Sequence, residues 1–189
     1  MKIAFVVYNN MTLLDFAGVY DPLTRLKTMG FCPDLTYAVC ARTDQVRSSE
    51  GVVLVPDRVM TDLSCFDLVI IPGGDGIKEL MQDRVFLAWI TVASERTTVA
   101  ALCGGSLLLG AAGLLRTRKA TTHPALMDIL ARFTQDVSGD RIVDAGPVIT
   151  AGGVTAGIDL GLYLCEKIAG STVREKIQMQ MDYRHYSPA

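Results

Sequence analysis

The segment that decides the fold class is Val99-Ala100-Ala101-Leu102-Cys103-Gly104-Gly105-Ser106-Leu107-Leu108-Leu109. Its first four residues are apolar and lack polar alternation, which is typical of a strand buried on both faces. One cysteine and two glycines follow, and the segment then continues with the apolar residues of a helix. A strand that passes through a tight turn into a helix is the repeating unit of α/β folds. We therefore expect a parallel sheet with helices packed against it.

The rest of the chain repeats this alternation of strands and helices. Runs rich in Val, Ile and Leu predict buried strands at residues 3–8, 35–41, 68–71 and 99–102. Apolar residues at helical spacing predict helices at residues 13–29, 86–93, 106–114, 158–169 and 172–180. A turn leading into a short antiparallel strand (48–55) and a late hairpin (141–143 with 148–150) are expected to decorate the main sheet. The predicted fold class is α/β, with a single domain over residues 1–189 and a mostly parallel sheet sandwiched between helices.

The composition limits the classes of function. The chain has 189 residues, 50% of them apolar, with 18 Lys and Arg against 20 Asp and Glu and a net charge of −2. This length fits one domain with a sizeable core. The near-neutral charge argues against nucleic-acid binding, and together with the apolar content it argues against intrinsic disorder. No run reaches the ~18 apolar residues that span a bilayer, so no membrane segment is expected.

The five cysteines, at positions 32, 40, 65, 103 and 165, are odd in number and widely spaced. No Cys-x-x-Cys pair is present, so the sequence predicts neither a zinc site nor a thioredoxin-type redox motif. No metal site is therefore expected. Free thiols of this kind indicate a reducing, cytoplasmic environment.

Cys103 is the main candidate for chemistry. Ligands of open α/β sheets bind outside the carboxyl ends of the strands, where this residue is expected. The small residues Ala101 and Gly105 flank it as in a nucleophile elbow, a turn that can force the cysteine into a strained backbone conformation. The N-terminus of the following helix should lower the pKa of the thiol and produce a thiolate at neutral pH. The alternative is a small buried hydrophobic residue at a tight connection.

Two other segments are candidates for the same edge of the sheet. Gly74 lies in a glycine turn after the strand at 68–71, and its N–H could form an oxyanion hole with that of Gly104. Alternatively, the turn needs its glycines only for positive φ. Asp15, near the start of the first helix, could hydrogen-bond the thiol or move a proton, especially if burial raises its pKa. The alternative is an acid that complements the helix dipole.

His123 and Thr122 are candidates for the wall of a pocket. His123 could act as the base of a Cys–His pair. The alternative is a threonine cap before a helix that starts near Pro124, with the imidazole ring in a structural role. The glycine turn at 150–159 could line the pocket or only pack closely, and close packing is the preferred interpretation.

Together these motifs resemble the ThiJ/PfpI superfamily, whose fold is flavodoxin-like and similar to class I glutamine amidotransferases. The resemblance covers nearly the whole chain. It is closest to the isocyanide (isonitrile) hydratase branch and to the similar N-terminal domain of AraC-type regulators. It rests on Leu14-Asp15-Phe16-Ala17-Gly18, Ile71-Pro72-Gly73-Gly74, Cys103-Gly104-Gly105-Ser106, Ala120-Thr121-Thr122-His123 and Gly152-Gly153-Val154-Thr155-Ala156-Gly157-Ile158-Asp159.

The resemblance implies a role for each candidate residue. Cys103 becomes the nucleophile at the elbow, Asp15 contacts the thiol or moves protons, and the N–H groups of Gly74 and Gly104 stabilise an oxyanion. An isocyanide hydratase of this type adds the thiolate to the terminal carbon of the isocyanide, forms a thioimidate, and releases an N-substituted formamide. The resemblance also implies a small-molecule substrate, no cofactor, and a homodimer with the active site near its interface.

The sequence departs from the hydratase branch at two positions. Gly104 stands where hydratases carry threonine, so a hydroxyl beside the thiol is lost, and Pro124 stands where tryptophan is frequent. Proteases of the superfamily carry histidine after the cysteine, so Gly104 argues against peptidase activity. A chain that stops at Ala189 argues against direct DNA regulation. The alternatives to a hydratase are a redox or small-molecule sensor based on Cys103, and a glyoxalase-like enzyme.

Overall fold

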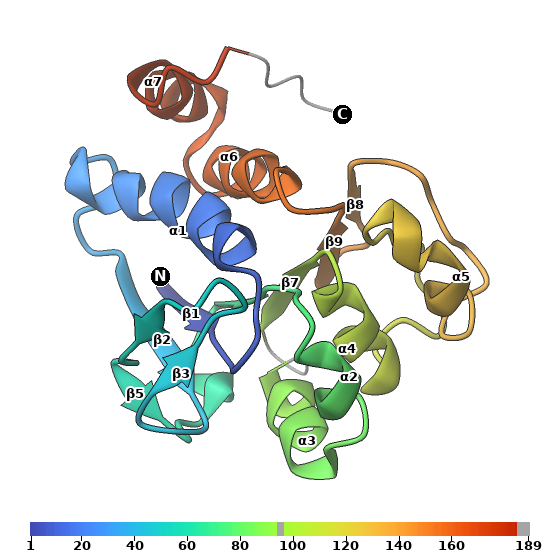
Figure 1. Ribbon diagram of the computed structural model, residues 1–189. Helices are drawn as coiled ribbons and strands as arrows, with labels where there is room; N and C mark the ends of the chain where they lie inside the picture. The colour runs from blue at the N-terminus through green and yellow to red at the C-terminus, as the bar shows by residue number, and fades with distance from the viewer. Residues whose placement is uncertain (94–96, 185–189) are drawn as a thin grey trace.

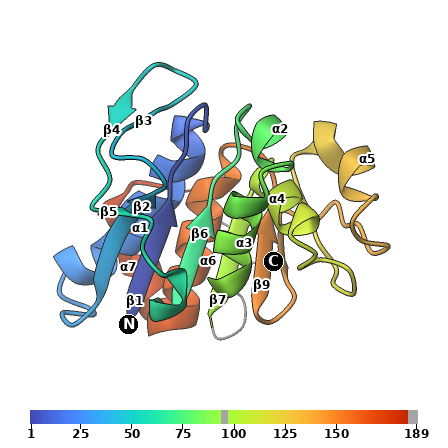
Figure 2. The same cartoon turned by 90° about the horizontal axis from the view of Figure 1, so that it is seen from below.

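The computed structural model describes residues 1–93 and 97–184. Within them, seven strands form a central sheet in the order β5-β2-β1-β6-β7-β9-β8 (Figures 1 and 2). Every neighbouring pair in this sheet is parallel except β8 and β9. The strands are β1 (Lys2–Val6), β2 (Thr36–Ala41), β5 (Arg58–Val59), β6 (Leu68–Ile71), β7 (Thr98–Leu102), β8 (Ile142–Asp144) and β9 (Val148–Ala151).

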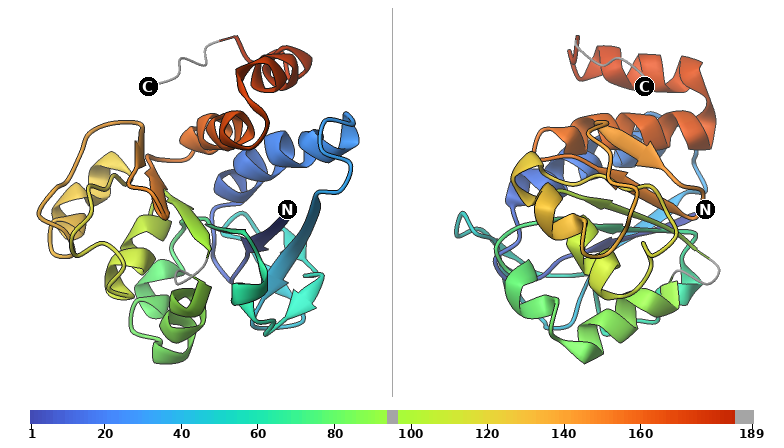
Figure 3. Two further views of the ribbon diagram at one scale, coloured as in Figure 1. Left: turned by 180° about the vertical axis from the view of Figure 1, so that it is seen from behind. Right: turned by 90° about the vertical axis from the view of Figure 1, so that its right-hand side faces the viewer.

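Helices cover both faces of this sheet (Figures 1 and 3). One face carries α1 (Leu13–Thr28) and α6 (Ala156–Ala169), with α7 (Ser171–Gln180) outside them. The other face carries α3 (Arg84–Ala93) and α4 (Gly105–Ala111). The short helical elements are η1 (Leu63–Cys65), α2 (Ile77–Leu80), η2 (Pro124–Leu126) and α5 (Met127–Leu130). The expected α/β sandwich with a mostly parallel sheet is therefore confirmed.

The close contact between α1 and α6 fixes where the candidate acid lies. A Cβ added to Gly18 on α1 would lie 3.2 Å from the backbone nitrogen of Ile158. A Cβ added to Gly157 on α6 would lie 3.2 Å from the carbonyl oxygen of Asp15. Because both positions lack a side chain, the first turns of the two helices pack backbone against backbone. The start of α6 therefore holds the start of α1, and with it Asp15, in place over the sheet.

Most of the expected elements appear within two residues of their predicted ends, but the late hairpin, one edge strand and one helix end differ from expectation. The late hairpin does not decorate the sheet, because β9 is fully buried and pairs in parallel with β7. The edge strand β5 was missed, since it has only two residues, both exposed, and so no apolar pattern. The helix expected at 106–114 ends at Ala111, and Gly113 follows with a φ of +80°, which an α-helix cannot contain.

The other expected antiparallel strand is present, but it does not decorate the main sheet as expected. β3 (Val46–Arg47) and β4 (Val53–Leu54) form an antiparallel pair that stands apart from the seven strands. This hairpin is tied to the start of α1, because the N–H of Leu13 donates to the Glu50 carboxylate at 3.0 Å. Among the helices of residues 1–93 and 97–184, none is both long enough and apolar enough to cross a bilayer.

Candidate functional site

Cys103 occupies the turn between β7 and α4, at the carboxyl edge of the sheet. Its φ is +53°, in the left-handed region that non-glycine residues rarely adopt. Its N–H donates to the carbonyl oxygens of Ala151 (3.1 Å) and Gly152 (2.8 Å), at the end of β9. A Cβ at Gly105 would lie 2.5 Å from the carbonyl oxygen of Ile71, so only glycine lets α4 start this close to β6. The strained turn expected from the sequence is therefore observed.

Thr122 supports this turn from the side of the cysteine carbonyl group. Its side chain is fully buried, and its hydroxyl donates to the carbonyl oxygen of Cys103 at 2.7 Å. The neighbouring residue is fixed to β9, because the N–H of Thr121 donates to the hydroxyl oxygen of Thr150 at 2.9 Å. The Thr122 hydroxyl therefore donates its proton to the backbone and not to the thiol. Gly104, the residue after the cysteine, has no hydroxyl to offer either.

Asp15 lies in the first turn of α1 and is completely buried. Its Oδ2 accepts the N–H of Gly73, which follows β6, at 2.9 Å. A Cβ added to Gly73 would lie 2.9 Å from both this Oδ2 and the Cβ of Cys103, so the carboxyl and the cysteine flank the same glycine. Among the described residues, Asp15 Oδ1 accepts no N–H or O–H. The structure therefore brings together Asp15 and Cys103, which the sequence placed at one edge of the sheet.

Burial controls the charge of this carboxyl group. The pKa of Asp15 is raised to about 7, mainly by removal from water and to a smaller extent by the negative charge of Glu50. The N–H of Gly73 and the thiol of Cys103 act in the opposite direction and lower this pKa, because both stabilise the carboxylate. Asp15 is therefore half-protonated near neutral pH, where it can both accept and release a proton.

The expectation that Cys103 is a thiolate at neutral pH is wrong. Burial raises the pKa of Cys103 to about 11, and the negative charge of Asp15 contributes to the increase. The N–H groups of Gly104 and Val154 interact with the sulfur and lower this pKa, as expected for a helix N-terminus. Their effect is smaller than that of burial. At neutral pH Cys103 is a thiol, and it becomes a nucleophile only if its proton moves to a neighbouring base.

The two glycines expected to donate to an oxyanion differ in their surroundings. The N–H of Gly104 interacts with the Cys103 sulfur. Gly74 has a φ of +126° and packs against the backbone of residues 10–12, where a Cβ would lie 2.4 Å from the nitrogen of Thr12. In the described part of the chain, no hydrogen bond uses the Gly74 N–H. Gly74 thus needs its positive φ, and the role of both glycines as oxyanion donors stays a prediction.

His123 has a structural role in this structure. Its Nδ1 accepts the N–H of Ala125 at 3.1 Å and caps η2, so the cap comes from the histidine rather than from a threonine. Its ring fills the space beside Gly153, where an added Cβ would lie 2.1 Å from Cδ2. His123 and Thr122 line a cavity of about 340 Å³, together with residues 139–141 and 152–155. Cys103 is not part of its lining, so this cavity lies beside the thiol and not around it.

Two groups near the thiol were not identified from the sequence. The hydroxyl of Tyr8, just beyond β1, donates to the carbonyl oxygen of Pro72 at 2.6 Å. Burial raises the pKa of Tyr8, and the charges of Asp15 and Cys103 add to the increase, so it lies close to both. Val154 was assigned to a turn that only packs, yet its N–H interacts with the Cys103 sulfur. Both follow strands that end at this edge, and that position was the available signal.

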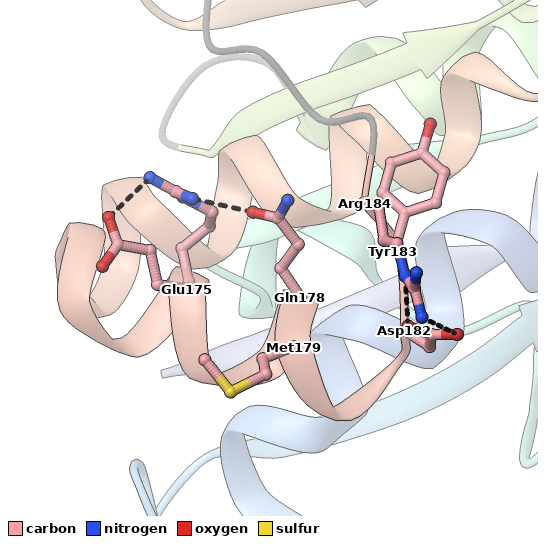
Figure 4. Close-up of a pocket in the computed structure, with 7 residues that line it drawn as sticks. Glu175, Gln178, Met179, Asp182, Tyr183 and Arg184 are labelled. Carbon is pink, nitrogen blue, oxygen red and sulfur yellow. Dashed lines mark hydrogen bonds and ion pairs between the residues drawn. The ribbon is translucent and has the colours of Figure 1, made fainter.

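Other features of the surface do not join this site. A cavity of about 480 Å³ lies along α7 and residues 182–184 (Figure 4). Its polar side chains contact one another, since Arg184 pairs with Asp182, and Arg174 contacts Glu175 and Gln178. In residues 1–93 and 97–184, no three His, Cys, Asp or Glu side chains form a cluster that could hold a metal ion.

The packing around Gly73 leads to a stability prediction. In Gly73→Ala the new Cβ would lie 2.5 Å from the nitrogen of Gly104 and 2.9 Å from the Asp15 carboxylate and the Cβ of Cys103. The nearest of these atoms belongs to the backbone of Gly104, and the Asp15 carboxylate is held by the Gly73 N–H, so the backbone must shift. We expect the free energy of unfolding, measured by urea denaturation, to fall by about 1–3 kcal/mol.

The matched control for this prediction is Gly139→Ala. A Cβ at Gly139 has no atom within 4 Å, and the residue does not need a positive φ. This variant should unfold at the same urea concentration as the original chain. Equal stability of the two alanine variants would contradict the close packing of Gly73 between Asp15 and Cys103.

The chain is similar to known proteins over most of its length. The DJ-1/PfpI family profile matches residues 1–167. The isonitrile hydratase of Pseudomonas putida is 36% identical over 190 residues, which cover 100% of this chain and 81% of the hydratase. A glutathione-independent glyoxalase of Caenorhabditis elegans is 28% identical over 131 residues, 68% of this chain and 70% of the relative. The crystal structure of a ThiJ/PfpI family protein from Pseudomonas syringae superposes with a TM-score of 0.87 at 33% identity, covering 100% of this chain and 77% of that one. The chain therefore belongs to the DJ-1/PfpI family.

Proposed function

We propose that the protein is a cysteine-dependent hydratase that adds water to the terminal carbon of an isocyanide. The observation that carries this proposal is the buried pair of Asp15 and Cys103 around Gly73. A thiol whose pKa is about 11 needs a base, and the adjacent carboxyl has a pKa of about 7. A group that titrates near the working pH is suited to take a proton and return it. The similarity to an isonitrile hydratase supports the same choice of substrate class.

The chemistry divides into two steps with Asp15 as the proton carrier. In the first, the Asp15 carboxylate takes the thiol proton while the Cys103 sulfur bonds to the terminal carbon of R–N≡C. The carbon then receives that proton from Asp15, which gives the thioimidate R–N=CH–S–Cys. In the second, the water oxygen bonds to this carbon, one proton of the water goes to the nitrogen and the other to the sulfur, and the C–S bond breaks. The product is R–NH–CHO, so one isocyanide and one water give one formamide.

The surroundings of the sulfur support these steps. The N–H groups of Gly104 and Val154 interact with the sulfur and stabilise the charge that develops when the proton leaves. The N–H of Gly74 is the proposed donor to the oxygen that water brings in the second step. No hydroxyl stands beside the thiol at position 104, so in this proposal Asp15 alone moves the proton.

The proposal is tested by incubating the protein with p-nitrophenyl isocyanide and following the formamide by chromatography. We expect formamide to accumulate over many turnovers, and rapid quenching to trap an adduct of the substrate mass on the peptide that contains Cys103. Absence of both formamide and adduct would overturn the proposal. A formamide without any adduct on Cys103 would contradict the covalent step.

A glyoxalase-like reaction is the second candidate, because a relative is named a glutathione-independent glyoxalase. It would convert methylglyoxal to lactate without glutathione, which an enzymatic lactate assay measures in the same preparation. A redox sensor based on Cys103 is less well supported. Oxidation by peroxide follows the thiolate fraction of a cysteine, and burial raises the pKa of this thiol to about 11.

The remaining expectations stay predictions: a homodimer, no cofactor, no nucleic-acid partner and a cytoplasmic location. A contact with a second copy is supported by apolar side chains near the start of α1. Leu14, Val52 and Val53 are exposed on the first turn of this helix and on the hairpin that Glu50 ties to it.

A further inference from the structure

The turn at residues 152–155 joins β9 to α6 and contributes two kinds of contact to Cys103. The carbonyl oxygen of Gly152 accepts the Cys103 N–H at 2.8 Å, and the N–H of Val154 interacts with the sulfur. Val154 has a φ of +27°, which is unfavourable for a β-branched residue. Such a conformation persists only where the surroundings hold it. The groups that hold this turn therefore control an N–H that the sulfur uses.

Arg141, the residue before β8, contacts both ends of this turn. Its carbonyl oxygen accepts the N–H of Gly152 at 2.9 Å. Its Nη2 donates to the hydroxyl oxygen of Thr155 at 3.2 Å, and its Nε donates to the carboxylate of Asp159. One residue thus connects the first residue of the turn, the last residue of the turn and the first part of α6.

Asp159 anchors this arrangement to the body of the protein. It is buried in α6, and its second carboxylate oxygen accepts the hydroxyl of Tyr183 at 3.0 Å. A buried carboxylate with two donors is fixed in position, so the guanidinium group that binds it is fixed as well. Arg141, whose side chain is about half exposed, is therefore held over the turn by a buried carboxylate of α6.

We propose that Arg141 is a positioning residue, which holds the turn at 152–155 against Cys103, so that the Gly152 carbonyl oxygen keeps the Cys103 N–H and the Val154 N–H stays beside the sulfur. This inference deepens the proposed function, and it rests on Cys103 being the reacting thiol. If the turn relaxes, the sulfur loses an N–H that favours its thiolate form. Cys103 should then react more slowly with an electrophile at any pH below its pKa, because the thiolate is the reacting species.

The test measures alkylation of Cys103 by iodoacetamide between pH 6 and pH 10.5, followed on the Cys103 peptide by mass spectrometry. Arg141→Gln removes the guanidinium group, and Thr155→Val removes only the hydroxyl that accepts its bond. We expect both variants to slow alkylation at pH 8 by about threefold to tenfold, the effect of one hydrogen bond, and to move the profile to higher pH. Thr155→Val keeps the charge of Arg141 and its pair with Asp159, so it separates positioning from a simple loss of positive charge.

The control is Arg25→Gln, which breaks an ion pair with Asp21 on α1 and should leave the alkylation profile unchanged. The titratable groups that face the thiol are Asp15 and Tyr8, and no variant replaces them. A shift of the profile therefore reports on the turn.

Each outcome either supports or overturns the inference. Lower thermal stability with an unchanged profile would leave Arg141 a purely structural residue. If Arg141→Gln does not fold, an unchanged profile in Thr155→Val overturns the inference by itself. Because alkylation does not depend on isocyanide turnover, a shifted profile in a protein without hydratase activity would separate this inference from a failure of the proposed function.

Discussion

Replacement of Cys103 by serine is expected to remove formamide production, with a fall in the turnover of p-nitrophenyl isocyanide of at least about 10³-fold. A serine hydroxyl is a much weaker acid and a poorer nucleophile than a thiol, so a carboxylate with a pKa of about 7 activates it far less effectively. The substitution changes one atom in a buried side chain, and the backbone contacts of residue 103 with Ala151 and Gly152 can form as before. The loss should therefore be chemical and not structural, and circular dichroism should be unchanged.

The matched control is Cys65→Ser, which makes the same change at an exposed thiol in η1. This variant should retain full activity. Turnover of the Cys103→Ser variant at more than a tenth of the original rate would mean that another group attacks the isocyanide. The adduct experiment then identifies that group, because the substrate mass would appear on a different peptide.

The sequence was sufficient to predict the elements that carry the thiol and the acid. The apolar run at 99–102 and the glycines that follow it are local signals, and so is the helical pattern that begins at Leu13. In a parallel sheet the turns after successive strands meet at one edge. This rule predicts Cys103 and Asp15 at the same edge, and the structure puts both beside Gly73.

The charge state of the thiol could not be predicted in this way. It depends on the depth of burial and on the distance to Asp15, which is 88 residues away in the sequence, and both result from packing. A helix N-terminus is visible in the sequence, whereas the desolvation that outweighs it is not. The same reason explains why Val154 was missed, since its N–H reaches the sulfur only because β9 lies directly beside β7.

Replacement of Asp15 by asparagine is expected to stabilise the protein at alkaline pH. Burial raises the pKa of Asp15 from an unfolded value of 3.8 to about 7, so the folded state binds this proton more tightly than the unfolded state. The stability that this proton gives is complete below about pH 4 and is lost as the pH rises through about 7. A shift of this size corresponds to as much as about 4 kcal/mol. Asparagine carries no charge, so Asp15→Asn should exceed the original chain in unfolding free energy at pH 8 and match it at pH 4.

The same substitution should lower isocyanide turnover by at least about 100-fold, because the amide can neither take the thiol proton nor return it to carbon. Its oxygen can still accept the Gly73 N–H, so the site should keep its shape. Urea denaturation at pH 4 and pH 8 and a turnover assay on the same preparations provide the test. A stable but inactive variant means that the protein keeps a destabilising carboxyl group for its chemistry. A variant that is less stable at pH 8, or that remains active, would mean that this carboxylate is well stabilised in the fold and does not act as the base.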